Sequence, residues 1–177
     1  MEKNAALIAR KAFPPIVFPE ESTITGQKVA FLVAQGIDGA AMLELGNMLE
    51  DAGAMVIYIA PFQGSITTVD GAVLQAWLTL ENASNMLFDA LVLPDGGVGI
   101  KALSAHKLTR AFLANQYRNG KVILAIGASR HLLDSAALSP LYSCSNEPDA
   151  VLLTESKNII SSGILFIGII ARHQCRY

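Results

Sequence analysis

Four short stretches of mostly apolar residues organise the sequence. They cover residues 29–34, 55–60, 88–93 and 122–126. A strand that is buried on both faces gives this pattern, whereas a strand with one face in water alternates apolar and polar residues. We therefore expect four strands in the interior of a parallel sheet.

Segments with helical spacing separate these strands. Asp38 is a candidate N-cap for a helix at 38–52, which stops before Gly53, a residue that adopts left-handed backbone geometry without penalty. Further helices are predicted at 104–119 and 129–136. Strand–helix–strand units with short connections require right-handed parallel crossovers. The pattern therefore predicts an α/β fold, in which a parallel sheet lies between layers of helices.

Two internal segments are less regular. Residues 65–80 predict a small excursion that turns at Asp70 and Gly71, because an Asp-Gly pair favours a tight turn. Residues 139–158 are rich in loop-forming residues, and no helix or strand is assigned to them before position 158.

The two ends of the chain differ from the middle. Phe-Pro pairs within residues 1–25 impose extended geometry and exclude a regular helix. We expect an extended N-terminal arm there, followed by a single domain at 26–177. Near the other end, a last strand is predicted at 158–161 and a closing helix at 164–174.

Composition narrows the class of protein. With 177 residues, 52% hydrophobic, 16% charged and a net charge of −2, the chain is too apolar to be disordered and lacks the basic surface of a nucleic-acid-binding protein. The longest apolar run, residues 164–171, is shorter than the roughly 20 residues of a membrane-spanning helix. Two cysteines without a CxxC motif, and an N-terminus without a signal segment, predict a cytoplasmic location.

Glycines follow three of the predicted strands, at Gly36, at Gly96 with Gly97, and at Gly127. Ligands of open parallel sheets bind beyond the carboxyl ends of the strands, where glycine allows close approach of the backbone. Glycine also serves short strand-to-helix turns that bind nothing. No phosphate-binding glycine motif follows the first strand, and the histidines lack metal-ligand spacing, so neither a phosphate site nor a metal site is predicted.

Three segments resemble the class I glutamine-amidotransferase-like superfamily, which includes PfpI and the Parkinson-associated deglycases. They are VAQGIDGAAM at 33–42, LFDALVLPDGG at 87–97 and NQYRNGKVILAIG at 115–127. Within that superfamily the sequence is similar in particular to the C-terminal domain of large-subunit catalases, over about residues 10–175. The resemblance implies a flavodoxin-like three-layer sandwich, with a mostly parallel sheet and helices on both faces.

The resemblance also places the superfamily's active site where this chain departs from the pattern. Enzymatic members end the fourth strand in a cysteine nucleophile, but that position is Gly127 here, followed by Ala128 where histidine often stands. The glutamate that those enzymes carry on the first helix corresponds to Ala41. Because nucleophile and partner act as a unit, we expect no cysteine-based catalysis. What remains is a vestigial or ligand-binding pocket formed by Ala41, Gly96, Gly97, Gly127, Ala128 and Ser129.

No other residue is a strong substitute for the missing nucleophile. Ser129 lacks a GxSxG context and is expected to cap the following helix, with His131 pointing away from it. Cys144 lies in an irregular segment with no candidate base nearby in sequence. His106 is expected to be a solvated helix residue, and His173 a surface or interface residue.

These observations favour a non-catalytic domain of the large-catalase type with a structural, stabilising or chaperone-like role. A haem catalase core cannot fit within this chain, so no haem or other cofactor is expected. The expected partners are a second copy of the chain, forming a dimer, and a haem catalase core, with no nucleic acid or membrane. Two alternatives remain, a PfpI-type hydrolase or carbonyl-modifying enzyme with a rebuilt site, and a small-molecule binding module at the glycine-lined strand ends.

Overall fold

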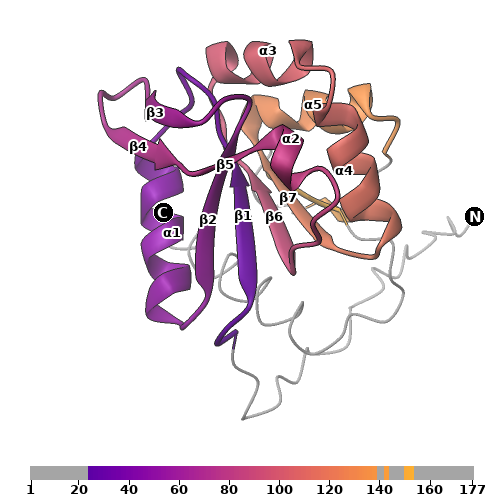
Figure 1. Ribbon diagram of the computed structural model, residues 1–177, viewed down its shortest axis with the longest axis horizontal. Coiled ribbons are helices and arrows are strands. Elements are labelled where there is room, and N and C mark those ends of the chain that lie inside the picture. Colours follow the sequence, from indigo (N-terminus) through magenta and orange to yellow (C-terminus); the bar gives the residue numbers. More distant parts are fainter. Residues whose placement is uncertain (1–23, 139–141, 144–149, 154–177) are drawn as a thin grey trace, which may run out of the picture.

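The computed structural model describes residues 24–138, 142–143 and 150–153 (Figure 1). A seven-stranded sheet in the order β5-β2-β1-β6-β7-β9-β8 runs through the middle, and β3 and β4 form a separate hairpin. The strands are β1 Lys28–Leu32, β2 Met55–Ala60, β3 Gly64–Thr67, β4 Val73–Ala76, β5 Leu78–Thr79, β6 Ala90–Leu93, β7 Val122–Ile126, β8 Tyr142–Ser143 and β9 Ala150–Leu153. The helices are α1 Ala40–Asp51, α2 Leu80–Ala83, α3 Gly97–Ala105, α4 Thr109–Arg118 and α5 Arg130–Ser135, and a 3-10 turn at Gly127–Ser129 precedes α5.

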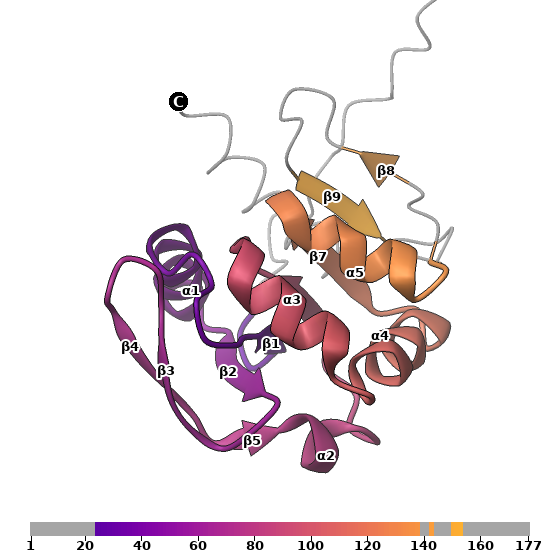
Figure 2. The same ribbon diagram turned by 90° about the horizontal axis from the view of Figure 1, so that it is seen from above.

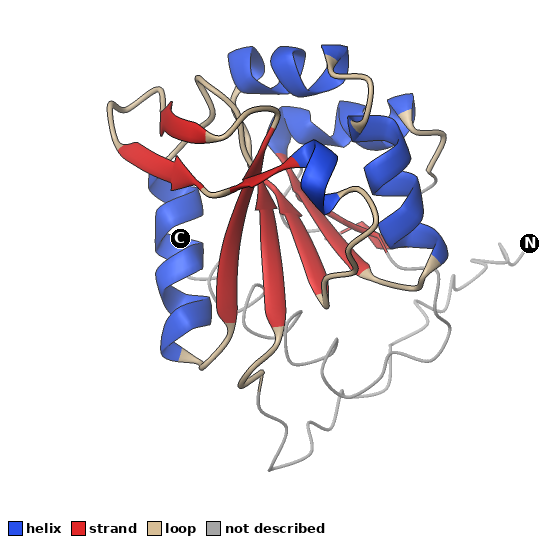
Figure 3. Cartoon of the chain, viewed as in Figure 1, coloured by secondary structure: helices blue, strands red, loops and turns tan. Residues whose placement is uncertain are grey.

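Successive strand residues pack on opposite faces of the sheet, as the pleat requires. On one face, Val29 and Phe31 of β1 share a core with the apolar side of α1 and with the hairpin. On the other face, Ala30 and Leu32 share a core with residues of α2, α3, α4 and α5. Figure 3 shows these layers, with α1 on one side of the sheet and α4 on the other. The predicted α/β, flavodoxin-like three-layer fold is confirmed.

All four predicted strands are present, and β1, β2, β6 and β7 pair in parallel. One of them is less buried than its continuous apolar run predicts. In β2 the side chain of Met55 is 53% exposed, because β5 pairs only with the last two residues of the strand. The first part of β2 therefore lies near an edge of the sheet rather than in its interior.

The prediction of a single helix at 104–119 is wrong. Two helices, α3 and α4, cover this region and are separated at His106, whose backbone is extended, with φ −79° and ψ 123°. The His106 N–H donates to the Leu103 carbonyl and its carbonyl accepts from the Thr109 N–H, so the break is a hydrogen-bonded turn. The apolar spacing continues through the break, which is why the pattern does not reveal it.

The excursion predicted at 65–80 is the β3–β4 hairpin, and its turn contains Asp70. This hairpin explains why Asp38 does not cap α1. The N-cap is Gly39, which has no side chain, and its N–H donates to Asp70 Oδ1 at 3.1 Å. A carboxylate from the hairpin thus accepts from the N–H of the N-cap residue, whereas a side chain at the N-cap would accept from an N–H in the first turn of the helix.

The segment predicted to be loop-rich at 139–158 contains two strands. β9 pairs antiparallel with β7, and β8 pairs antiparallel with β9. The predicted arm lies almost wholly outside the described residues, and so do the strand at 158–161 and the helix at 164–174. In the part of the chain that is described, no helix is both long enough and apolar enough to span a membrane.

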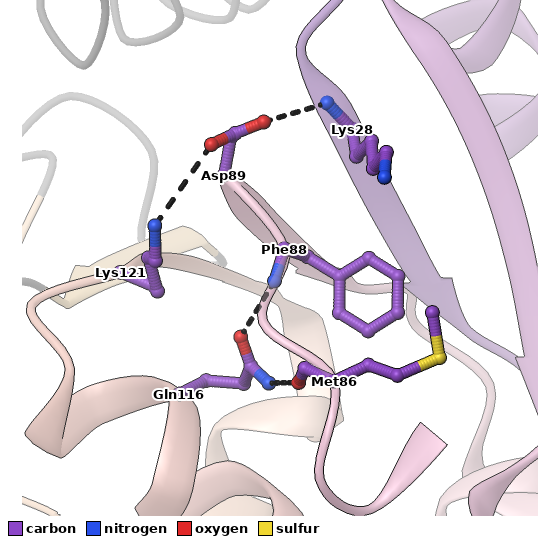
Figure 4. Close-up of polar contacts among 6 residues, drawn as sticks. All are labelled: Lys28, Met86, Phe88, Asp89, Gln116 and Lys121. Atoms are coloured by element: carbon purple, nitrogen blue, oxygen red, sulfur yellow. Dashed lines mark hydrogen bonds and ion pairs between the residues drawn. The ribbon is translucent and has the colours of Figure 1, made fainter. Parts of the chain in front are cut away.

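Polar side chains tie the loop before β6 to its neighbours (Figure 4). The buried Gln116 amide of α4 accepts from the Phe88 N–H at 3.2 Å and donates to the Met86 carbonyl at 2.6 Å. The Asp89 carboxylate accepts from the Lys28 N–H at 2.8 Å and lies 3.8 Å from the Lys121 ammonium. These contacts fix the start of β6, and so help to set where its carboxyl end meets the site described below.

Candidate functional site

The turn that follows β7 keeps the geometry of a strand-to-helix elbow. β7 ends at Ile126, and the 3-10 turn at Gly127–Ser129 leads directly into α5. Gly127 has φ +58°, in the left-handed region that favours glycine. The elbow lies at the carboxyl edge of the parallel strands, where ligands and catalytic groups of such sheets gather.

The side chain of Asp95 fills the space beside this elbow. β6 and β7 pair in parallel with Leu93 opposite Ala125, so two residues further on Asp95 comes opposite Gly127. A Cβ atom built on Gly127 would overlap the Asp95 carboxylate. The place where a side chain at position 127 would begin is therefore occupied by a carboxylate from the neighbouring strand end.

Two backbone N–H groups hold the carboxylate there. Asp95 Oδ1 accepts from the Gly96 N–H at 2.7 Å and from the Ala128 N–H at 2.9 Å. Hydrogen bonds to an ionised acceptor are stronger than those between neutral groups. The bonds bind the ends of β6 and β7 to each other through one side chain.

The ends of β1 and β6 are packed backbone against backbone. The Asp38 N–H donates to the Asp95 carbonyl at 2.8 Å, and Gly96 has φ +124°. A Cβ atom on Gly96 would overlap the backbone of Ile37, whose side chain is fully buried. β1 and β6 flank the point where the strand order reverses, the usual ligand crevice of such sheets. In this chain that point is closed by its own backbone.

The structure brings some of the predicted site residues together and leaves others apart. Gly96, Gly127 and Ala128 surround the Asp95 carboxylate. Gly97 begins α3 and is exposed. Ala41 is exposed in the first turn of α1, where its methyl group offers no carboxylate to the elbow.

Ser129 is the N-cap residue of α5, as predicted, but its side chain makes no capping hydrogen bond to the helix. Its hydroxyl is fully buried and lies 2.8 Å from the Leu93 carbonyl and 2.7 Å from the Ile126 carbonyl, the last residues of β6 and β7. His131 is at the surface, 3.6 Å from the Asp134 carboxylate. The predicted separation of Ser129 from His131 is confirmed, and the serine serves the junction of two strands.

His106 is also placed differently from the prediction. It ends α3 instead of lying on an exposed helix face, and its Nδ1 atom is buried with no hydrogen-bond partner among the described residues. Cys144 and His173 lie outside the described residues. Among residues 24–138 and the two short strands beyond, no group of three or more metal-ligating side chains gathers.

Asp95 is the site residue that the sequence analysis misses. Its position could have been found from the sheet, because adjacent parallel strands bring the residues after their carboxyl ends side by side. Chemically, the site offers a carboxylate whose Oδ1 atom accepts from two N–H groups, and among the described residues no thiol, hydroxyl or imidazole hydrogen-bonds to it. Nothing in this set of groups resembles a nucleophile paired with a base.

Comparison with known proteins agrees with the fold and with the resemblance in sequence. Catalase HPII of Pseudomonas putida is 30% identical over 122 residues, which are 69% of this chain and 17% of that protein. Catalase C of Rhizobium meliloti is 31% identical over 143 residues, which are 78% of this chain and 20% of that protein. The chain thus spans about a fifth of the length of the catalases it matches.

Among solved structures, a mutant of a DJ-1 superfamily protein from Salmonella typhimurium superposes with a TM-score of 0.57 and 29% identity, covering 60% of this chain and 58% of the other. DJ-1beta of Drosophila melanogaster superposes with a TM-score of 0.61 and 21% identity, covering 65% and 62%, and shows the shared fold. Residues 27–146 match the DJ-1/PfpI family over most of the described domain. The chain therefore belongs to the DJ-1/PfpI family.

Proposed function

We propose that this domain is not catalytic and has a structural or stabilising role, as its resemblance to the C-terminal domain of large-subunit catalases suggests. One observation carries the proposal, the Asp95 carboxylate beside Gly127. Where related enzymes carry a nucleophile, this chain has no side chain, and the adjoining volume is filled by a group from another strand.

The hydrogen bonds of Asp95 add a second reason. Catalysis at a carbonyl needs N–H groups free to bind the negative charge that develops on oxygen. At this elbow, the Gly96 and Ala128 N–H groups already donate to Asp95 Oδ1. A substrate would have to displace the Asp95 side chain from both donors and would still find no nucleophile at position 127.

Apolar groups on the surface support a role in an assembly. Trp77 is 74% exposed and lines a groove with Val56, Ile57 and Tyr58 of β2. Exposed apolar surfaces of this kind often mark contacts between proteins. We infer that the chain forms a homodimer or packs on a haem catalase core. Sedimentation of the full chain, alone and with such a core, tests this, and a monomer that binds no core would contradict it.

Turnover of methylglyoxal and of a fluorogenic peptide tests the proposal for the elbow. We expect the wild-type chain, Asp95→Asn and the control Asp89→Asn to give no rate above buffer. Asp89 is a suitable control because its carboxylate also accepts a backbone N–H, but at the start of β6 rather than its end.

Two results would overturn a non-catalytic role. Turnover lost in Asp95→Asn and kept in Asp89→Asn would instead support an enzyme rebuilt around Asp95. Turnover that survives both substitutions in repeated, independent preparations would place catalysis elsewhere in the chain.

A further inference from the structure

A second site at the carboxyl edge of the sheet is open. A crevice of about 460 Å³ lies between the ends of β1 and β2, the start of β3 and the C-terminal half of α3. The Gln35 amide, which follows β1, fixes one wall, because it donates to the Ser65 carbonyl at 2.9 Å and accepts from the Thr67 N–H at 2.8 Å. The walls are thus held by β1, by the hairpin and by α3.

Helix α3 separates this crevice from the elbow. Figure 2 shows α5 on one side of α3 and the hairpin across from it on the other. α3 contacts the turn at Gly127–Ser129 and α5, whereas Ala102, Ala105 and His106 line the crevice. Binding in the crevice therefore does not depend on whether the elbow is catalytic.

The crevice is mainly apolar but borders one unsatisfied polar side chain. Its apolar lining includes Pro61, Phe62 and Ala102, and none of the described lining residues is Asp, Glu, Lys or Arg. His106 Nδ1 is buried with no hydrogen-bond partner within the described part of the chain. A buried polar atom without a partner carries a free-energy cost that a ligand could relieve.

Phe62, another residue of the crevice lining, lies against that imidazole. The two rings meet edge to face, with centroids 6.2 Å apart and an interplanar angle of 87°. The Phe62 side chain is 78% exposed, so few other contacts hold it in place. Rotation of this ring away from His106 would cost little packing and would uncover the imidazole on the crevice side.

We propose that this crevice binds a small neutral molecule with an aromatic ring and one hydrogen-bonding group. The ring packs against the apolar lining in the place opened by Phe62, and the polar group pairs with the His106 imidazole. The volume and the apolar lining with few polar groups match those of small-molecule sites in general. A charged ligand is disfavoured, because no described lining residue would compensate its charge.

Titration of the full chain with phenol and with toluene, followed by ligand-observed NMR, tests the proposal. We expect phenol to bind with a Kd on the order of 1 mM, which is well within the affinity that a molecule of that size can reach. Toluene should bind about tenfold more weakly, because it cannot make the hydrogen bond. In His106→Phe the preference for phenol should disappear.

Ala102→Trp should abolish binding by filling the crevice, and Ser104→Trp is the matched control, since Ser104 is exposed on the same helix but is not part of the lining. Ala105→Met fills the crevice from a neighbouring position if the tryptophan variant fails to fold. Absence of phenol binding to the wild type, or binding that Ala102→Trp and Ala105→Met leave unchanged, would overturn the site. An unchanged preference for phenol in His106→Phe would overturn the role of the imidazole.

Discussion

Two places at the carboxyl edge of the sheet lie on either side of α3 and differ in what fills them. At the elbow, the space beside Gly127 holds the Asp95 carboxylate, with both nearby N–H groups engaged. In the crevice beyond β2, about 460 Å³ stays open beside a histidine nitrogen that has no partner among the described residues. The elbow, where the resemblance places the nucleophile of related enzymes, is therefore closed, and the crevice on the other side of α3 is open.

The difference is what the proposed non-catalytic role requires, with an elbow geometry that is kept and a space beside it that is filled. Gly127 still has the left-handed φ of an elbow. The Asp95 carboxylate beside it is held by two backbone N–H groups. We therefore expect substitutions at the elbow to lower the free energy of unfolding and to leave no enzymatic activity to lose.

The largest effect is expected at the elbow. Gly127→Ala should lower the free energy of unfolding by about 2–4 kcal/mol, because a Cβ there requires left-handed geometry and displaces a carboxylate from two hydrogen bonds. Gly120→Ala is the matched control, since Gly120 has φ +68° and nothing within 4 Å of an added Cβ. It should cost about 1–2 kcal/mol, the backbone term alone. Equal losses in urea unfolding would show that Asp95 does not fill the elbow.

A smaller effect is expected at Ser129, which joins the ends of β6 and β7. Ser129→Ala should cost about 1–3 kcal/mol, because a fully buried hydroxyl that contacts two carbonyl groups is removed. Ser135→Ala deletes a comparable bond to the Leu132 carbonyl at an exposed position and should change stability by less than about 0.5 kcal/mol. Thermal unfolding of both variants measures the difference. If Ser129→Ala lowers stability no more than Ser135→Ala does, the buried hydroxyl does not stabilise the junction of β6 and β7.

The smallest effect is expected on the crevice side, where Asp70 holds the hairpin to α1. Hydrogen bonding with the Thr68 side chain, helped by its own N–H and that of Gly39, lowers the pKa of Asp70. A lowered pKa in the folded state stabilises the fold above the unfolded-state value of 3.8, and this contribution is lost as pH falls through the folded-state pKa. We expect wild type to be more stable than Asp70→Asn at neutral pH, with the gap closing in acid. Urea midpoints with a gap that does not change with pH would contradict this.

The sequence predicts the strands and layers of this fold better than it predicts the turns and contacts that connect them. The mostly apolar runs locate all four parallel strands, since burial on both faces favours apolar residues at nearly every position of a strand. The sequence does not reveal the break at His106, because the apolar spacing continues across it. It does not reveal β9 either, because four residues of strand in a loop-rich segment give little periodicity. Asp70 at the start of α1 also escapes, since it lies 31 residues from Gly39.

In the candidate site, too, the sequence predicts some features and not others. The sequence shows directly that residues 127 and 128, where the resemblance places the nucleophile, are glycine and alanine. What fills the space depends on the register of β6 against β7, a property of the assembled sheet. Ser129 shows the same limit, because a serine before a helix usually caps it, and only the packed junction reveals that its hydroxyl turns toward two strand ends instead.

A double-mutant cycle between positions 95 and 127 tests the central claim most directly. The cycle compares the cost of Gly127→Ala in the wild type with its cost in Asp95→Ala, both from urea unfolding. If the carboxylate occupies the elbow, truncating it should reduce the cost of the added Cβ by at least about 1 kcal/mol, a clear departure from additivity. Costs that agree within about 0.5 kcal/mol in the two backgrounds would show that Asp95 and the elbow are independent.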